Sequence, residues 1–473
     1  MLKLRFTSRS ARSIPRPASK VFAARRSVIT GSASSICTRR HYTQFFRSAS
    51  FAAAQRFPAQ SSQDDSQPSF NASDLPTSTA NDREVFIQWD NTSWSRFHHL
   101  WLRDHCRCPE CFHSVTKQRL VNTFEIPPDI EPVSVESKPE GLQLTWPSSS
   151  LPHVSLYPWS WLRRNSYDPP APPESTEKVL WGSKIVQRPP TVAYEDVMAE
   201  DGHGLYKWLH KIDKFGFCFV SDVPPTPEAT EEVSRRIGFI RETHYGGFWD
   251  FTADLARGDT AYTNMALGAH TDNTYFTDPC GIQLFHLLSH TEGTGGETLL
   301  VDGFYVASIL KELHPEVYQL LSTIPVPAHA AGEEDVFYRA TRPVLGQDLE
   351  TGDLKSVRWN NDDRSVLRNV PTGIMLQWYD AIRTWNKFLT SPDSEYWVQL
   401  SPGTVVAVDN HRVLHGRSAF TGTRRMCGAY IGGDEFRSRL TVLSERFGDL
   451  RERSDTPSGD LRKAGRSVWN VGL

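Results

Sequence analysis

The sequence predicts a mainly β fold with interspersed helices, divided into a small amino-terminal domain and a larger carboxy-terminal domain. Short apolar runs such as 281–288 and 403–409 are rich in branched residues and bounded by Gly, Pro or Asn, which is typical of buried strands. Helical patterns, with apolar residues three and four positions apart, separate several of these runs. With 473 residues, 38% of them apolar, and 25 Phe, 14 Tyr and 14 Trp, the chain can fill more than one core.

The first 63 residues are strongly basic. They contain twelve Lys or Arg, no Asp or Glu, and many Ser and Ala, a composition typical of a mitochondrial transit peptide. A disordered basic arm that contacts nucleic acid is the alternative. We therefore predict a transit peptide over 1–63 and a location in the mitochondrial matrix.

The remainder of the chain is acidic. It holds 40 basic and 55 acidic residues, a formal charge of −15. This charge disfavours nucleic acid as a partner and favours a cationic small molecule. No apolar run reaches the roughly 18 residues that a membrane-spanning helix needs, so no membrane partner is expected.

Residues 64–82 are rich in Ser, Gln, Asp and Pro, which is typical of a linker. A small β-rich domain is predicted over 83–175. It opens with the strand-like run 84–89 and ends near the Pro-rich segment 168–173. It also contains three of the seven cysteines of the chain, within Cys106-Arg-Cys108-Pro-Glu-Cys111.

The cysteine cluster predicts a structural zinc site. Three thiolates and one nitrogen complete a tetrahedral zinc site, and closed sites of this kind contribute folding energy. A nucleic-acid-binding ribbon would need a second cysteine pair, and an iron–sulfur cluster would need a fourth thiolate. His105 and His113 lie so near the cysteines in the sequence that the loop would have to fold tightly back on itself for either of them to be the fourth ligand. His153, which follows the strand-like run 141–147, is therefore the better candidate for the fourth ligand.

The large domain is predicted over 190–447. Its strands are expected at 216–220, 281–288, 298–301 and 403–409, and its helices at 205–212, 227–237, 304–313, 315–322 and, as the last one, 375–390. Residues 448–473 are rich in Glu, Arg, Ser, Asp and Gly and form a polar tail. The tail is predicted either to be disordered or to cover the edge of a sheet.

Two short motifs predict an iron site in this domain. His270-Thr-Asp272 and His415-Gly-Arg417 supply two histidines and one carboxylate, the ligand set with which oxygenases hold Fe(II) while leaving positions open. A chain with 16 His contains roughly one H-x-D by chance, but here each motif adjoins a predicted strand. The two ligand segments are expected on separate strands of one β core. Arg424 follows nine residues after His415, and its planar guanidinium suits the carboxylate of a cosubstrate. The sequence therefore predicts oxygenation chemistry.

The motifs resemble a known family. The stretch 270–303, with Tyr275-Phe276, Cys280-Gly-Ile-Gln283, Gly295-Gly296 and Leu300-Val-Asp-Gly303, and the segments Asn410-His-Arg-Val-Leu-His-Gly-Arg417 and Cys427-Gly-Ala-Tyr430 carry the resemblance. They resemble the γ-butyrobetaine/trimethyllysine hydroxylase family of Fe(II)/2-oxoglutarate oxygenases, and more closely its trimethyllysine branch. The resemblance begins near Phe86 and covers most of the chain.

This resemblance implies a distorted double-stranded β-helix, a jelly roll, for the large domain. It implies Fe(II) on His270, Asp272 and His415, 2-oxoglutarate held by Arg424 with Thr298 as a second donor, ascorbate as a further cofactor, and a homodimer. It also supports His153 as the zinc ligand, because the related enzymes carry a histidine just beyond the equivalent Trp-Pro.

The resemblance further implies how a substrate is bound. Tyr245, Trp249, Tyr262 and Tyr430 fall on positions that form an aromatic cage for a trimethylammonium group in the γ-butyrobetaine enzyme, and aromatic faces attract such cations. Tyr430 is expected on the strand that follows the strand of Arg424. Core packing is the alternative for each ring. Asp259 stands where the butyrobetaine enzymes have Asn and suits an α-ammonium group, although a turn residue beside Gly258 is the alternative. Asn361 resembles the family asparagine that binds the substrate carboxylate, and neighbouring Asn360 is nearly as good a candidate.

The predicted reaction is hydroxylation of N6,N6,N6-trimethyl-L-lysine at C3, the first step of carnitine biosynthesis, with succinate and CO2 as coproducts. γ-Butyrobetaine dioxygenase, the last step of the same pathway, is one alternative. A non-catalytic zinc-containing binding protein is the other alternative. The presence of all the residues predicted to bind iron and 2-oxoglutarate argues against it.

Overall fold

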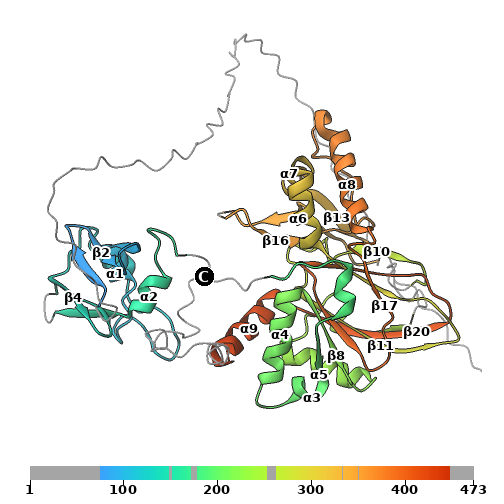
Figure 1. Cartoon of the computed structure of the whole chain (residues 1–473), viewed down its shortest axis with the longest axis horizontal. Coiled ribbons are helices and arrows are strands. Elements are labelled where there is room, and N and C mark those ends of the chain that lie inside the picture. Colours follow the sequence, from blue (N-terminus) through green and yellow to red (C-terminus); the bar gives the residue numbers. More distant parts are fainter. Residues whose placement is uncertain are drawn as a thin grey trace, which may run out of the picture. The chain divides into compact units, whose positions relative to one another are not determined.

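A computed structural model describes residues 75–148, 152–171, 178–252, 263–332, 334–349 and 351–447 (Figure 1). The predicted transit peptide, most of the predicted linker, the polar tail, Asp259 and Tyr262 lie outside these residues.

The small domain consists of two three-stranded antiparallel sheets that share one core. The first sheet contains β1 (Thr77–Ala80), β2 (Glu84–Gln88) and β3 (Trp94–His98), and the second contains β4 (Ser134–Lys138), β5 (Gly141–Trp146) and β6 (His153–Tyr157). Helices α1 (His99–Asp104) and α2 (Trp159–Arg164) and the 3-10 turn η1 (Thr123–Glu125) complete the domain. Alternate residues of the strands face the core, among them Val85 and Ile87 on β2 and Leu142, Leu144 and Trp146 on β5.

Strand β1 lies inside the segment 64–82 that the sequence predicted as linker, so that prediction was wrong for Thr77–Ala80. These four residues pair antiparallel with β2. The β-branched residues Thr77 and Thr79 favour a strand, whereas the surrounding Ser, Pro and Asp dominate the composition of the segment. Composition averaged over nineteen residues hid a four-residue strand.

Two facing sheets build the large domain, and the predicted mainly β fold is confirmed. Six strands follow the order β7-β8-β18-β11-β20-β9, and four follow the order β10-β19-β12-β17. Consecutive strands change sheets: β10, β12 and β19 belong to the smaller sheet, and β11, β18 and β20 to the larger one. This winding is the double-stranded β-helix. The strands are β7 (Thr191–Ala193), β8 (Phe217–Ser221), β9 (Phe248–Thr252), β10 (Leu267–His270), β11 (Ile282–Thr291), β12 (Thr298–Asp302), β17 (Tyr396–Val398), β18 (Val405–Asp409), β19 (Val413–Arg417) and β20 (Thr423–Ile431).

Helices cover the outer faces of the two sheets (Figure 1). Helices α3 (Tyr194–Met198), α4 (His203–Phe215), α5 (Pro227–Ile237) and α9 (Gly433–Phe447) pack on the six-stranded sheet, and α6 (Gly303–Leu313), α7 (Pro315–Thr323) and α8 (Met375–Leu389) pack on the four-stranded sheet. The remaining elements are η2 (Ser183–Gln187), β13 (Val326–Ala330), β14 (Tyr338–Arg342), β15 (Leu345–Gln347), β16 (Leu354–Val357) and η4 (Thr372–Ile374).

Helix α9 was not predicted, and the expectation that 375–390 holds the last helix was wrong. The helix carries only two fully buried apolar residues, Phe436 and Leu443, among charged ones. Seven positions, or two turns, separate them, and they pack against the core under the six-stranded sheet. So sparse an apolar stripe gives a weak helical period in the sequence.

The strand alternation decides which side chains face the space between the sheets. On β18, Val405 and Ala407 pack against helices, whereas Val406 and Val408 face inward. On β19, Leu414 packs outward and Val413 inward. The period of two therefore places His415 and Arg417 on the inner face of β19.

A buried ion pair fixes the start of β19. Arg412 is 1% exposed and donates to both carboxylate oxygens of Asp302, at 3.0 and 2.8 Å. It also donates to the carbonyl oxygens of Lys214 and Val179, at 3.0 and 2.6 Å. Because all these groups are buried, removal of one partner would leave an uncompensated charge. The pair thus holds the turn that leads into the strand of His415.

Buried His286 on β11 is expected to make the domain sensitive to acid. Its Nε2 accepts from the Gly403 N–H at 3.1 Å, so its Nδ1 donates to Thr230 Oγ1 at 2.7 Å, and the ring is neutral. Burial lowers the pKa of His286 to about 4. The unfolded chain, with an ordinary histidine pKa of about 6.5, binds the proton first as the pH falls.

The stabilisation from neutral His286 is therefore complete above pH 6.5 and decreases as the pH falls toward 4, by up to about 3 kcal/mol. Thermal unfolding between pH 4 and 7 measures this effect. The His286→Gln variant, which keeps one donor and one acceptor, should show a smaller decrease than the wild type. Parallel curves for the two proteins would contradict the assignment.

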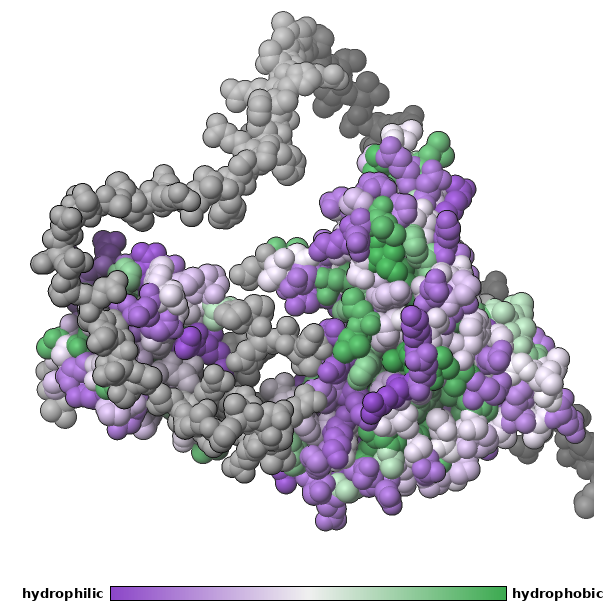
Figure 2. All heavy atoms as spheres, in the orientation of Figure 1, coloured by the Kyte–Doolittle hydropathy of each residue, from purple (hydrophilic) through white to green (hydrophobic). Residues whose placement is uncertain are grey.

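Hydrophilic and intermediate side chains cover most of the face shown in Figure 2, with smaller hydrophobic groups among them. Within the described ranges, no helix combines the length and the apolar character needed to cross a membrane.

Candidate active site

A cavity of about 360 Å³ in the large domain contains the predicted iron ligands. His270 ends β10, Asp272 lies two residues later, and His415 lies on β19. His270 and His415 are direct partners in the antiparallel pairing of β10 with β19. The expectation of two ligand segments on separate strands of one β core is thus met by adjacent strands.

The three side chains converge on one point. The Nε2 atoms of His270 and His415 lie 3.2 and 3.5 Å from Oδ1 of Asp272, and the two imidazole rings are 4.7 Å apart. Neither ring nitrogen of buried His415 has a hydrogen-bond partner among the described residues. Two imidazole nitrogens and one carboxylate oxygen on one face are the donors that Fe(II) oxygenases use.

Neighbouring groups orient these ligands. His270 Nδ1 lies 2.8 Å from the Gly268 carbonyl oxygen, to which it donates, and this hydrogen bond turns the ring so that Nε2 faces Asp272. Asn410 accepts from the Asp272 backbone N–H at 2.7 Å and donates to the Asp272 and Cys280 carbonyl oxygens at 3.0 and 3.1 Å. The turn before β19 therefore holds the backbone of the Asp272 segment.

Charge also couples His270, Asp272 and His415. Burial opposes ionisation of Asp272, but its contacts with His270 and His415 hold the pKa of the carboxyl well below its usual range. Burial alone would lower the pKa of His270, yet Asp272 raises it to about 9, whereas burial lowers the pKa of His415. The site thus presents an anion flanked by two imidazoles.

The second carboxylate oxygen of Asp272 has partners that the sequence did not reveal. Gln283 Nε2 on β11 and the Tyr430 hydroxyl on β20 each donate to Oδ2 at 2.7 Å. Gln283 is 2% exposed and Tyr430 6%. A polar Gln in the mainly apolar run 282–288 was the signal that could have identified the first of them.

Arg424 lies on the wall of the same cavity, as does Thr298 on β12. Arg424 is 6% exposed, and its Nε has no hydrogen-bond partner within the described part of the chain. Burial, together with neighbouring Arg417, lowers its pKa to about 10, so it stays charged at neutral pH. A buried cation in a cavity favours an anionic ligand.

Three of the four predicted cage residues, Tyr245, Trp249 and Tyr430, line the cavity. The rings of Trp249 and Tyr430 are 6.3 Å apart, and the Tyr245 hydroxyl lies 3.0 Å from that of Tyr275. Tyr430 was expected on the strand after that of Arg424, but both lie on β20, on the same face because six positions separate them. The expectation of separate strands was therefore wrong, although both residues do line the cavity.

Gly428 determines how Trp249 lies. The two residues are cross-strand partners on β20 and β9. A Cβ on residue 428 would overlap the Trp249 ring and the Leu284 carbonyl oxygen. The absence of a side chain at this position lets the indole lie flat against the sheet, and sequence reasoning missed this role.

A polar wall completes the cavity. It includes Asn361 and Asn360, the two candidates for a substrate carboxylate, and the carboxylates of Asp362 and Asp363. Thr274 donates to Asp363 at 2.7 Å, and Asn361 accepts from Arg364. The two aspartates were not predicted, although the run Asn360-Asn-Asp-Asp363 stands out in the sequence.

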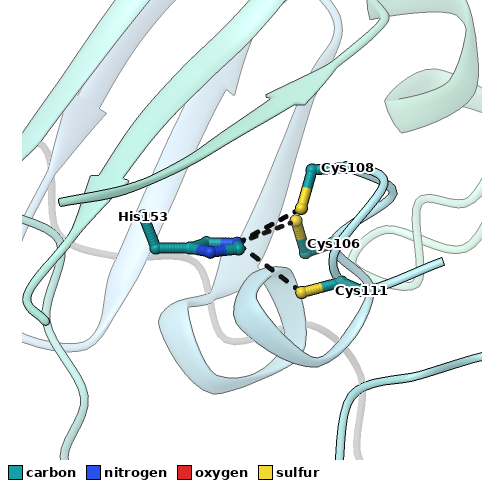
Figure 3. A group of neighbouring side chains, drawn as sticks. All are labelled: Cys106, Cys108, Cys111 and His153. Atoms are coloured by element: carbon teal, nitrogen blue, oxygen red, sulfur yellow. Dashed lines mark hydrogen bonds between the residues drawn. The ribbon is translucent and has the colours of Figure 1, made fainter. Parts of the chain in front are cut away.

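The second candidate metal group lies in the small domain, between α1 and the start of β6 (Figure 3). His153 Nε2 lies 3.3, 3.6 and 3.6 Å from the sulfur atoms of Cys106, Cys108 and Cys111. Glu110 lies 3.3 Å from Nδ1 of His153, and Ser155 donates to Cys106 at 2.9 Å. His105 and His113 do not belong to this group. The described cysteines form no disulfide.

Comparisons with known proteins cover both domains. Residues 174–430 match the family model of the taurine catabolism dioxygenase TauD, TfdA family, and residues 77–163 match a gamma-butyrobetaine hydroxylase-like N-terminal model. The trimethyllysine dioxygenase of Meyerozyma guilliermondii is 46% identical over 376 residues, which are 76% of this chain and 93% of that protein.

Two human proteins are also similar. The mitochondrial trimethyllysine dioxygenase is 44% identical over 353 residues, 74% of this chain and 83% of that protein. The gamma-butyrobetaine dioxygenase is 30% identical over 374 residues, 76% of this chain and 94% of that protein.

Proposed function

Because the chain belongs to the trimethyllysine dioxygenases of the TauD/TfdA family, we propose that it hydroxylates N6-trimethyllysine at C3. The reaction consumes O2 and 2-oxoglutarate and yields 3-hydroxy-N6-trimethyllysine, succinate and CO2. It is the first step of carnitine biosynthesis. The observation that carries the proposal is the presence, in one cavity, of the His270, Asp272 and His415 group, a wall of aromatic rings and an Arg424 Nε that has no hydrogen-bond partner among the described residues.

His270, Asp272 and His415 would hold Fe(II), which supplies the activation of O2 when bound. Arg424 pairs with the distal carboxylate of 2-oxoglutarate, and Thr298 on the neighbouring wall donates a second hydrogen bond to it. Ascorbate keeps the iron reduced. The buried, low-dielectric setting strengthens the attraction of Arg424 for the cosubstrate.

The aromatic wall suits the trimethylammonium end of the substrate. A quaternary ammonium donates no hydrogen bond, so ring faces attract it, at about 0.5–2 kcal/mol per contact. Tyr245, Trp249 and Tyr430 form the described part of this cage, and Tyr262 belongs to it by the family pattern. The cage positions the substrate so that C3 faces the metal.

The amino-acid end of trimethyllysine distinguishes it from γ-butyrobetaine, which lacks the α-ammonium group. Asn361, assisted by Asn360, holds the substrate carboxylate. Asp259 pairs with the α-ammonium, and the acidic wall of Asp362 and Asp363 favours a cationic ligand in the same cavity.

The cysteine group of the small domain binds structural zinc. Bonds of about 2.3 Å to sulfur and about 2.05 Å to nitrogen in a tetrahedron give S···N distances of about 3.6 Å, and the three observed distances are 3.3 to 3.6 Å. Glu110 accepts from Nδ1 of His153 and thereby leaves Nε2 as the ligand atom. The site stabilises the small domain and takes no part in the reaction.

The basic first 63 residues direct the protein to the mitochondrial matrix, and the mammalian relatives carry the word mitochondrial in their names. Following the family pattern, the protein acts as a homodimer.

The test is an assay of succinate and hydroxylated product, with Fe(II), 2-oxoglutarate and ascorbate, for trimethyllysine and γ-butyrobetaine in turn. We expect turnover of trimethyllysine at a much higher kcat/KM. Preference for γ-butyrobetaine would assign the other enzyme of the pathway, and turnover of neither would support a binding protein.

Substitution Asp259→Asn is expected to reduce discrimination between the two substrates. A carboxylate that pairs with the α-ammonium contributes about 1.5–3 kcal/mol, and about 1.4 kcal/mol corresponds to a tenfold change. The kcat/KM for trimethyllysine should therefore fall about tenfold or more, with little change for γ-butyrobetaine. Trp249→Ala is the control, because the cage serves both substrates and its loss should weaken both. Equal losses in Asp259→Asn would show that Asp259 is a turn residue.

A further inference from the structure

The Asp272 carboxylate presents its two oxygens to different surroundings. Oδ1 faces the Nε2 atoms of His270 and His415, at 3.2 and 3.5 Å. Oδ2 points away from them and accepts from Gln283 and Tyr430, each at 2.7 Å. Two short hydrogen bonds to an ionised oxygen are strong and directional, so they fix the rotation of the carboxylate about its Cβ–Cγ bond.

The sheet explains how these two donors reach one atom. Gln283 and Tyr430 are direct cross-strand partners on β11 and β20, in the register that pairs Ile282 with Ile431 and Leu284 with Ala429. Both face inward, because Ile282 and Leu284 beside Gln283, and Ile431 beside Tyr430, pack toward the outer helices. Side chains at such paired positions lie about 5 Å apart at Cβ and can converge on a common acceptor.

Both residues line the cavity, but Tyr430 also contributes an aromatic ring to its wall. The ring lies 6.3 Å from that of Trp249, whereas the hydroxyl donates to Asp272. We propose that Tyr430 is a positioning residue that connects the aromatic cage with the metal site: its ring forms a cage wall, and its hydroxyl, with Gln283, holds Asp272 so that only Oδ1 faces the metal. The cage role rests on the proposed function, but the role of the hydroxyl does not.

The test measures Fe(II) binding without substrate, under argon, by isothermal titration calorimetry. Tyr430→Phe keeps the ring and removes the donor, and Gln283→Leu removes the other donor without touching the cage. Because loss of groups that orient a ligand typically weakens metal binding about 10–100-fold, we expect the Kd for Fe(II) to rise at least about tenfold in each variant, with melting temperatures close to wild type.

Tyr245→Phe is the matched control. It removes a hydroxyl from the same cage, but that hydroxyl lies beside Tyr275 and not beside Asp272. Its Fe(II) affinity should equal that of the wild type. The Kd of trimethyllysine in Tyr430→Phe should also stay within about threefold of the wild-type value, because the ring carries the cation–π contact.

Unchanged Fe(II) affinity in both Tyr430→Phe and Gln283→Leu would overturn the proposal. If Tyr430→Phe weakens trimethyllysine binding and leaves Fe(II) binding intact, the hydroxyl contacts substrate and the proposal also fails. Since Fe(II) binding is measured without substrate, an error in the assigned substrate would leave this result unaffected.

Discussion

Replacement of Asp272 by Ala is expected to abolish succinate formation, with a loss on the order of 10³-fold or more, equivalent to about 4 kcal/mol of transition-state stabilisation. Asp272 is the one anionic member of its group, and both histidines face its Oδ1. Without it, two imidazoles remain beside an open cavity. The strands that carry them keep their own pairing, so the fold should persist.

Two measurements check this expectation: succinate formed per minute, and Fe(II) bound per chain under argon. Asp278→Ala is the control, because this carboxylate is 77% exposed and pairs with Arg241 on the surface. It should retain full activity and iron. Substantial turnover in Asp272→Ala would exclude the group as the iron site.

The second large effect is expected for Cys108→Ser in the small domain. A structural zinc site contributes much of the folding free energy of a small domain, and the loss of such a metal belongs to the most destabilising changes known. We expect a loss of more than about 4 kcal/mol and a decrease of roughly 15 °C or more in the melting temperature of this domain. Zinc content should fall below one ion per chain.

The choice of the fourth ligand can be tested in the same way. His153→Ala should lose zinc as Cys108→Ser does, whereas His113→Ala should retain it, because His113 is exposed and outside the group. Activity at low temperature should remain in all three variants. A zinc ion retained by both Cys108→Ser and His153→Ala would show that the cluster is not a closed zinc site.

The sequence predicted the groups whose chemistry is carried within one segment. His270-Thr-Asp272 and the cysteine loop are local motifs, and the strands beside them have clear apolar runs. The helix at Pro227–Ile237 was predicted to the residue from Pro227 at its start, and in the structure the Thr226 side chain caps it. The shared strand of Arg424 and Tyr430 was not predicted, because Tyr430 was expected on the strand after that of Arg424.

Relations between strands were not predictable in this way. That Gln283 faces Tyr430, or Trp249 faces Gly428, depends on strand order and register, which a single sequence does not encode in its spacing. Neither did the spacing show that Asn410 would hold the backbone at Asp272. The hydrogen bonds that orient the ligands therefore came from the structure, and the ligands themselves from the sequence.

The contact between Trp249 and Gly428 constrains how the substrate range of this enzyme can evolve. Because any side chain at 428 would collide with the Leu284 carbonyl oxygen as well as with the indole, a larger residue there is excluded even when Trp249 has become smaller. Mutational paths toward substrates without a quaternary ammonium should thus begin at 249, and libraries that vary 428 alone should yield few active clones.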